Sequence, residues 1–404
     1  MAIERTIYRE IPVSPRLWAA AALLAAFVLS GLGAFLYVEH RGHVATGMTN
    51  QIVWGMPHVF AIFLIVAASG ALNVASMASV FDRKIYKPLS RLSGLLAISL
   101  LLGGLSVLVL DLGRPDRLIV QMTHFNFTSI FTWNILLYSG FLAIVAVYLW
   151  VQMDRNVHPK WVKPAGLLAF VWRLALTTGT GSIFGWLVAR PGYDAAVMAP
   201  LFIAMSFALG LAVFVLVLQG LCVLARCPLG QTLIERLTRL LALFVAVVLY
   251  FTVLQHLTNL YAAEHTGFEA FILFDGGVFP LLFWIGQIVV GSLVPLALVY
   301  GRKTPVSPGL ASAVCLLVIL GGVAQIYVIV IGGQAYPMEI FPGYEVSSTF
   351  FDGQVAGYAP SVPEVFLGIG GGALALFATG LGARVLRIVP TTLSDQNLAG
   401  KGQE

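Results

Sequence analysis

Three side chains suited to acid–base chemistry lie where long apolar segments of the chain begin or end. His58 is near the start of one such segment, and Asp111 and Arg114 follow the end of another. An imidazole takes up and releases a proton near neutral pH, so it can act as a general acid or base. A carboxylate and a guanidinium beside it would hold a small molecule by charge. We therefore expect these residues to bind a ligand that exchanges protons at a membrane surface.

The residues around Asp111 form a compact element, LDLGRP at positions 110–115, and His124 and Trp133 follow shortly after it. The proline disfavours helical geometry at the residue before it, so we expect a helix to end here. Asp111 and Arg114 then lie about one turn apart. They form either a surface ion pair of little energetic value or, beside this aromatic and histidine-containing stretch, the wall of a quinone pocket.

Polar side chains also occur inside the apolar segments, where ionisable groups are costly and usually face a cavity or a partner. Arg173 lies near the middle of one segment, with Thr177 one turn further on, and Asn73 belongs to a polar stripe that follows His58. We interpret them as a path for protons. The alternatives are a structural arginine paired with a carbonyl group, or one that reaches toward the membrane edge, and helix packing for Asn73.

A third polar cluster brings Gln255 and His256 together near the outer end of a later segment, with Glu264 just beyond it. His256 and His58 are expected at similar membrane depth. This leaves two interpretations open. They are axial ligands of a b-type haem, or they are hydrogen-bonding and proton-transfer groups at a small-molecule site.

The composition indicates the elements that position these groups. Of 404 residues, 59% are apolar and 10% are charged, and the mean hydropathy is +0.91, which is typical of a membrane protein. We predict one all-α, polytopic membrane domain over 1–404 with about ten transmembrane helices of roughly 20 residues each. The expected segments are 15–38, 52–80, 89–110, 129–152, 164–189, 196–224, 237–262, 277–300, 310–333 and 364–386.

The basic residues predict the orientation of these helices. Eighteen of the 23 Lys and Arg residues lie at the termini or in alternate loops, and the other loops hold four. Basic residues in short loops remain preferentially in the cytoplasm, so both termini are predicted there. The net charge of +5 is spread between apolar segments rather than gathered on a soluble face, which argues against nucleic acid as a partner.

Three cysteines without a Cys-x-x-Cys spacing predict no metal site, no c-type haem and no iron–sulfur cluster in this chain. Cys222, Cys227 and Cys315 are expected on the cytoplasmic side, in the reduced state and with structural roles. The longest outward loop, 334–363, carries acidic and aromatic residues but no Lys or Arg. We interpret it as a lid, as a docking surface for a partner with a basic rim, or as both.

The 110–115 element at the outer end of the third helix, before a Trp-bearing fourth, resembles the NrfD-type family of polysulfide-reductase membrane subunits. The ten-helix length is similar to a branch that includes the membrane subunit of the Dsr complex of sulfite reduction. The resemblance implies two four-helix bundles, at 52–189 and 196–333, and peripheral first and last helices within 1–51 and 364–404. It also implies a chain without its own redox centre in a bacterial inner-membrane complex of sulfur metabolism.

The resemblance further implies that menaquinone or ubiquinone binds near the outer face and exchanges electrons with a periplasmic iron–sulfur subunit. Family members keep His, Asp and Arg residues around the quinone. These are carried onto His58, Asp111, Arg114 and His124 here. A b-type haem anchor with His58 and His256 as axial ligands is one alternative. Others are a secondary transporter, suggested by possible half-helices at Gly179–Gly181 and Gly370–Gly372, and a purely structural anchor.

Overall fold

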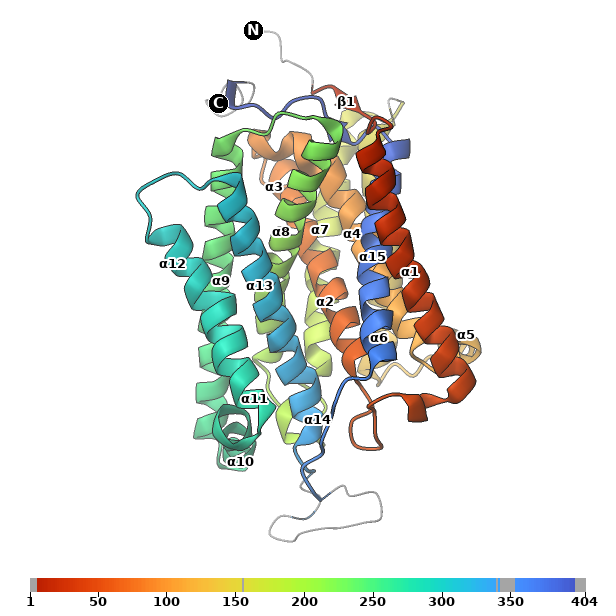
Figure 1. Cartoon of the computed structure of the whole chain (residues 1–404), viewed down its shortest axis with the longest axis vertical. Coiled ribbons are helices and arrows are strands. Elements are labelled where there is room, and N and C mark those ends of the chain that lie inside the picture. Colours follow the sequence, from red (N-terminus) through yellow and green to blue (C-terminus); the bar gives the residue numbers. More distant parts are fainter. Residues whose placement is uncertain (1–5, 155, 339–340, 342–352, 397–404) are drawn as a thin grey trace.

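The computed structural model describes residues 6–154, 156–338, 341 and 353–396. Within these residues the chain is a bundle of long helices that lie side by side (Figure 1). One short antiparallel pair of strands, β1 (Tyr8–Arg9) and β2 (Val389–Pro390), joins the two ends of the described chain. The predicted all-α, polytopic fold is therefore confirmed.

The longer helices follow the predicted segments closely. Several carry a short π-helical or 3-10 part, here labelled η. The main elements are α1 (Pro15–Arg41), α2 (Met56–Ala71), α3 (Asn73–Ser79), α4 (Ser90–Leu110), α5 (Leu118–Thr123), α6 (Ile130–Met153), α7 (Val162–Ile183), α8 (Met198–Ala225), α9 (Gln231–Tyr261), α10 (Thr266–Ala270), α11 (Val278–Leu281), η8 (Leu282–Leu293), α12 (Val294–Tyr300), α13 (Pro308–Tyr327), η9 (Val328–Gly332), α14 (Gly333–Ala335) and α15 (Val362–Val385).

Nine helices in the described part of the chain are long and apolar enough to cross a membrane. The tenth predicted crossing is α7, which Arg173 and several threonines make more polar than the others. It packs between α6 and α8. Because β1 pairs with β2, the two ends of the described chain meet at one end of the bundle. That closure requires an even number of passes, and α7 together with the nine apolar helices gives ten among the described residues.

The opposite end of the bundle carries α5, α10 and α14 (Figure 1), and we call it the distal end. The helix from Met56 starts at this end, and α4 and α7 finish there. The connection after α9 was expected to be an outward loop. It instead forms η6 (Ala263–His265), α10 and η7 (Phe271–Asp275), which fold back against α9.

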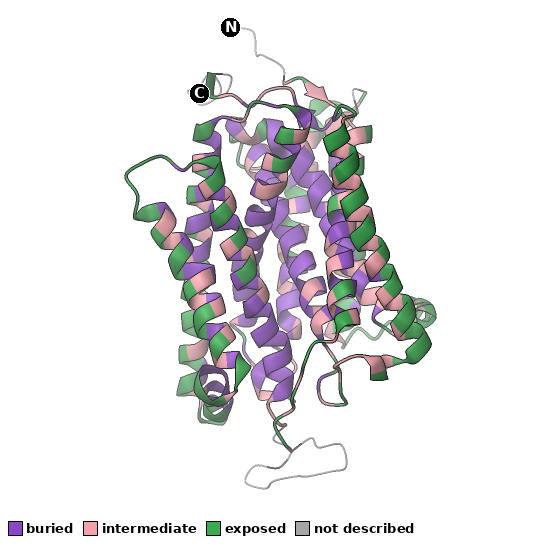
Figure 2. Cartoon of the chain, in the orientation of Figure 1, coloured by how far each residue is buried: buried purple, intermediate pink, exposed green. Residues whose placement is uncertain are grey.

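The core centres on α2, α8 and α13, which Figure 2 shows as mostly buried, whereas α1, α9 and α12 expose apolar side chains. Helix α2 meets α8 at Gly70 and Gly210. A Cβ atom at either position would overlap the backbone of the other helix. Small residues allow such an approach in membrane helices, where dispersion contacts rather than hydrophobic exclusion hold helices together.

Helix α1 lies against α15, and α15 in turn packs on α4 and α2. The division of 52–189 and 196–333 into two bundles stays a prediction, since buried residues of both halves form one continuous apolar core. The two glycine-rich stretches suggested as half-helices lie inside helices α7 and α15, which run without interruption. This removes one of the observations that favoured a transporter.

The contact between Gly70 and Gly210 predicts a position-specific effect on stability. We expect Gly210→Leu to destabilise the protein by about 3 kcal/mol or more, because the side chain has no space beside Gly70. Gly220→Leu on the same helix is the matched control, since no atom lies within 4 Å of its Cβ position. Thermal unfolding in detergent measures both. Equal melting temperatures for the two variants would show that α2 and α8 do not pack as described.

Candidate functional site

His58 and Asp111 meet at the distal end of the bundle. His58 lies in the first turn of α2, and Asp111 caps the last turn of α4. The antiparallel packing of these helices brings His58 Nδ1 to 3.0 Å from Asp111 Oδ2, which is an ion-pair distance. The angle is outside that of a hydrogen bond, so neither atom has a hydrogen-bond partner among the described residues. The Asp111 side chain is 3% exposed and that of His58 is 20% exposed. The pair therefore forms a nearly buried acid–imidazole site that can still be reached from one side.

The turn after Asp111 depends on Gly113. Its φ of 67° lies in the left-handed region, which favours glycine. A Cβ atom there would also lie 2.9 Å from Nε2 of His43. The predicted helix end is thus confirmed, and glycine contributes to it as well as the proline at 115.

Trp54 covers the imidazole of His58. The two rings are stacked, with centroids 6.1 Å apart and planes at 25°. Trp54 also stacks on Tyr193, at 5.9 Å, and meets the edges of Phe131 and Phe184, each at 6.0 Å. These rings come from four separate segments. They place His58 against an aromatic, largely apolar wall.

Gln334 holds the backbone of Trp54 in position. Its Oε1 accepts hydrogen bonds from the backbone N–H groups of Val53 and Trp54, each at 3.0 Å. Its Nε2 donates to the carbonyl groups of Trp54 and Val330. Arg190 donates to the carbonyl of Gln334 at 3.0 Å. This role was not predicted from the sequence, because Gln334 was expected to be the first residue of an outward loop.

The N-terminus of α2 is also fixed by the far end of the chain. The Tyr358 hydroxyl accepts from the backbone N–H of Met56 at 2.6 Å and donates to Glu364 Oε1 at 2.7 Å. Burial, followed by the Glu364 carboxylate, raises the pKa of Tyr358. Its hydroxyl therefore stays protonated and can keep both bonds. Most of the acidic and aromatic residues predicted for loop 334–363 lie outside the described residues.

The segment after α4 does not join this cluster. Arg114 pairs instead with Asp116, with Nη2 3.0 Å from Oδ2. The two side chains are 63% and 60% exposed. This hydrogen bond lowers the pKa of the Asp116 carboxyl. His124 contacts only Thr123 among the described hydrogen-bond partners, and Trp133 donates to a neighbouring backbone carbonyl. These groups lie on the exposed surface of the distal end.

Arg173 lies at the centre of a separate, fully buried group. Its Nη1 donates to the carbonyl of Ser69 at 3.3 Å, and its own carbonyl accepts from the hydroxyls of Ser69 and Thr177. Phe170 and Phe207 lie 5.0 and 4.6 Å from the guanidinium carbon. Its Nε and Nη2 atoms, like Nδ2 of Asn73, have no hydrogen-bond partner among the described residues.

His256 pairs with a residue that was not predicted from the sequence. Glu269 Oε2 lies 2.6 Å from His256 Nδ1, and Glu269 is completely buried. Gln255 is buried nearby, whereas Glu264 is exposed. Glu269 lay in a stretch that was expected to be a loop, so only its presence beside apolar neighbours in the sequence could have indicated burial. Each of His58 and His256 thus has its own carboxylate partner.

Comparison with known proteins places the chain among membrane subunits. The family described as polysulphide reductase, NrfD, matches residues 44–338. The Hdr-like menaquinol oxidoreductase integral membrane subunit of Archaeoglobus fulgidus is 28% identical over 376 residues, which cover 92% of this chain and 94% of that protein. A selenate reductase subunit of Mesobacillus selenatarsenatis is 25% identical, with 77% of this chain and 80% of that protein covered. A polysulfide reductase subunit of Wolinella succinogenes is 23% identical, with 71% and 96% covered.

The packing around His256 yields a prediction about haem. We expect the purified chain to give no pyridine haemochrome spectrum of haem b, because the cavity lined by His256 has a volume of about 20 Å³ and cannot hold a porphyrin ring. The purified full chain is measured after its partners have been washed away, with a known haem b protein as the positive control. One haem b per molecule would contradict this packing.

Proposed function

The chain belongs to the polysulphide reductase NrfD family, and on that premise we propose that it is the quinone-binding membrane subunit of a redox complex. The observation that carries this proposal is the acid–imidazole pair of His58 and Asp111, only 3.0 Å apart, under the ring of Trp54. A quinone is an apolar ring with two oxygens that take up or release protons. The aromatic wall suits the ring, and the imidazole suits an oxygen.

The roles of the two residues follow from their contact. Asp111 faces Nδ1 of His58, which leaves Nε2 as the ring nitrogen for the substrate. Asp111 favours the tautomer with a proton on Nδ1, so Nε2 can accept a proton from a quinol hydroxyl. Oxidation of a quinol releases two protons and two electrons. His58 and Asp111 handle the protons, and the electrons pass to a redox centre of a partner subunit.

Menaquinone or ubiquinone is the proposed substrate. The name of the Archaeoglobus fulgidus relative, which includes menaquinol, supports the first of these. In this proposal Arg114, His124 and Trp133 line the exposed mouth of the site rather than its base, since none of them contacts the buried pair. There, Arg114 attracts the quinone oxygens as they approach, while its pairing with Asp116 keeps it near the surface.

We further propose that the distal end faces the periplasm of a bacterial inner membrane, with both termini in the cytoplasm. The excess of Lys and Arg near the end that carries the termini supports this orientation. The partner is then a periplasmic, ferredoxin-like iron–sulfur subunit within a larger complex of sulfur metabolism. The likeness to a polysulfide reductase subunit supports this assignment.

The most detailed part of the proposal concerns proton movement toward the membrane interior. Asn73, Arg173 and Thr177 belong to one half of the bundle, and Gln255 to the other. The two guanidinium nitrogens of Arg173 without a protein partner would bind water in this apolar setting, because buried donors need an acceptor. Exposed Glu264 then serves only as a surface group.

An apolar groove beside Asp111 suits the isoprenoid tail of the quinone. The groove has a volume of about 410 Å³ and lies between α1, α4 and α15. Leu110, the neighbour of Asp111, lines one end, and Leu102, two turns away along α4, lines the other. A tail in this groove would leave the ring close to the pair.

The first prediction concerns the pair itself. We expect His58→Gln and Asp111→Asn each to lower quinol-dependent turnover about 100-fold, the typical contribution of a general acid or base. Turnover is measured on the native complex, and size-exclusion chromatography checks its assembly. His158→Gln and Asp154→Asn are matched controls on the loop after α6, where both side chains only accept bonds from nearby backbone N–H groups. Normal turnover in either site variant would refute the assignment.

The second prediction concerns the groove. Ser106→Trp should fill it and raise the KM for a long-chain quinol several-fold, while the KM for a tail-less quinol stays unchanged. Ser30→Trp on another face of the bundle is the control. Both serine hydroxyls bond only to a carbonyl of their own helix, so neither change breaks a contact between helices. An equal effect on both quinols would place the tail elsewhere.

A further inference from the structure

A second acid–imidazole pair lies in the other half of the bundle, and the proposed quinone site does not use it. Glu269 on α10 is completely buried. Its Oε2 lies 2.6 Å from His256 Nδ1, and its Oε1 accepts from Asn259 Nδ2 at 2.8 Å. The His256 ring meets the edge of Phe283 at 4.7 Å. Both carboxylate oxygens thus have partners, and one partner can itself carry the proton.

Two small cavities continue from this pair toward the middle of the bundle. One, of about 20 Å³, is lined by Gln255 and His256, and it shares Gln287 and Gln325 with a second of equal volume. A cavity of this volume holds about one water molecule, given polar partners. The same volume excludes a quinone ring. The cavities therefore suit water and not a second quinone.

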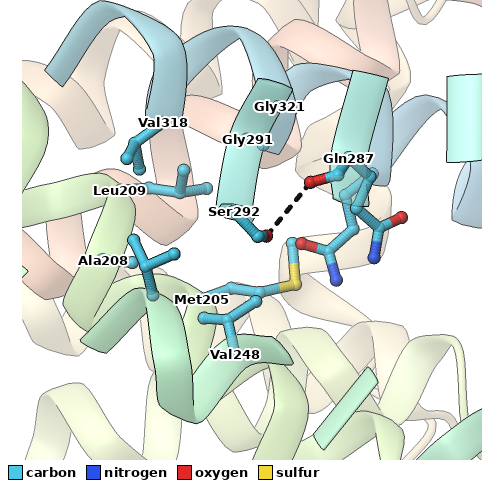
Figure 3. A pocket seen from close by; sticks show the side chains of 12 residues that line it. Met205, Ala208, Leu209, Val248, Gln287, Gly291, Ser292, Val318 and Gly321 are labelled. Atoms are coloured by element: carbon cyan, nitrogen blue, oxygen red, sulfur yellow. Dashed lines mark hydrogen bonds between the residues drawn. The ribbon is translucent and has the colours of Figure 1, made fainter. Parts of the chain in front are cut away.

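The polar groups between the two cavities are connected. The Thr252 hydroxyl accepts from Nε2 of both Gln287 and Gln325, at 3.3 and 3.2 Å. Ser292 donates to the carbonyl of Gln287 at 3.0 Å (Figure 3). Beyond Ser292 the lining is apolar, with Met205, Ala208, Leu209, Val248 and Val318 around it (Figure 3). The polar track consequently ends inside the bundle.

The other end of the track leads to the distal surface. His265 lies one turn before Glu269, and its side chain is 10% exposed. Its Nε2 is 3.9 Å from Oδ2 of Asp194, whose side chain is 44% exposed. His265 Nδ1 is buried without a hydrogen-bond partner among the described residues. Asp194 and His265 thus lead from solvent to a point one helical turn from Glu269.

The charged surroundings of Glu269 are otherwise sparse. The elements packed against α10 are α9, η6 and η7. Tyr336 also packs against Phe268 of α10. With it and the neighbouring groups on and after η5 (Pro191–Tyr193), the titratable groups at this end are His256, Tyr261, Glu264, His265, Asp275, Tyr193, Asp194 and Tyr336. Of these, His256 alone has a described hydrogen bond to Glu269.

We propose that Glu269 and His256 form a proton-binding site that is loaded from the distal face through Asp194 and His265. Loading adds one proton from the water at that face, and Glu269 Oε2 and His256 Nδ1 share it. Waters between Gln287 and Gln325 can exchange this proton further into the bundle. The site needs no quinone, so it stands independently of the proposed function.

Infrared difference spectra of the purified full chain, recorded during a pH titration, test the site. A protonated carboxylic acid has a C=O stretching band that the carboxylate lacks. Every carboxyl group contributes to this band, so we compare variants and expect one titrating component of the band to disappear in Glu269→Gln. In His256→Gln the band should remain, with its midpoint moved to higher pH by about one unit or more, because the imidazolium that favours the carboxylate is gone. His265→Leu should slow the shift of the band after transfer to D2O.

Two further variants serve as controls. Glu364→Gln removes the other almost completely buried glutamate of the described residues, whose described hydrogen bonds go to backbone N–H groups and the Tyr358 hydroxyl rather than to an imidazole. Asp111→Asn removes the carboxylate of the quinone site. Both should leave the band and its midpoint unchanged. The proposal is wrong if the titrating carboxyl band of Glu269→Gln lacks no component of the wild-type band. Should that variant not fold, an unchanged midpoint in His256→Gln overturns the proposal.

Discussion

An ionisable side chain inside an apolar bundle needs a partner, because hydrocarbon offers no water to solvate it. This constraint organises the interior of the protein. Asp111 meets His58, Glu269 meets His256, and Arg173 meets a carbonyl and two aromatic rings. In the first two cases the partner is an imidazole, which can share a proton rather than only neutralise a charge. Among the described residues, the requirement for pairing thereby creates two places where an imidazole lies beside a buried carboxylate, and these are the sites that we propose exchange protons.

The distal end of the bundle, where His58 and Asp111 lie, is held together by hydrogen bonds between segments far apart in the sequence. Gln334 holds the backbone at Trp54, and Tyr358 and Glu364 hold the start of α2 at Met56. These contacts join the first helices of the chain to residues near its C-terminal end. The position of His58 consequently depends on the second half of the chain, although His58 and its carboxylate both belong to the first.

Much of the architecture could be predicted from the sequence. Apolar segments of membrane-spanning length and the charge bias of the loops depend on local composition, so they can be counted without knowing any contact. The helix end at Asp111 was likewise local, since glycine and proline act on their own backbone. Glu269 shows where prediction from the sequence fails. It lies in a short connection after α9, and apart from its apolar neighbours nothing local distinguishes an exposed glutamate there from one that α10 carries into the bundle.

The sequence by itself determined the all-α membrane fold, about ten crossings and an element of acidic and basic residues at 110–115. Only the tertiary structure decided which charges meet. Arg114 and Asp111 are neighbours in sequence, yet Arg114 pairs with Asp116 at the surface, whereas Asp111 turns to His58. The physical reason is that hydropathy and helix signals act along the chain over a few residues. The pairing of buried charges depends instead on how helices distant in sequence pack. That packing decides which side chain takes the place of water beside each buried charge.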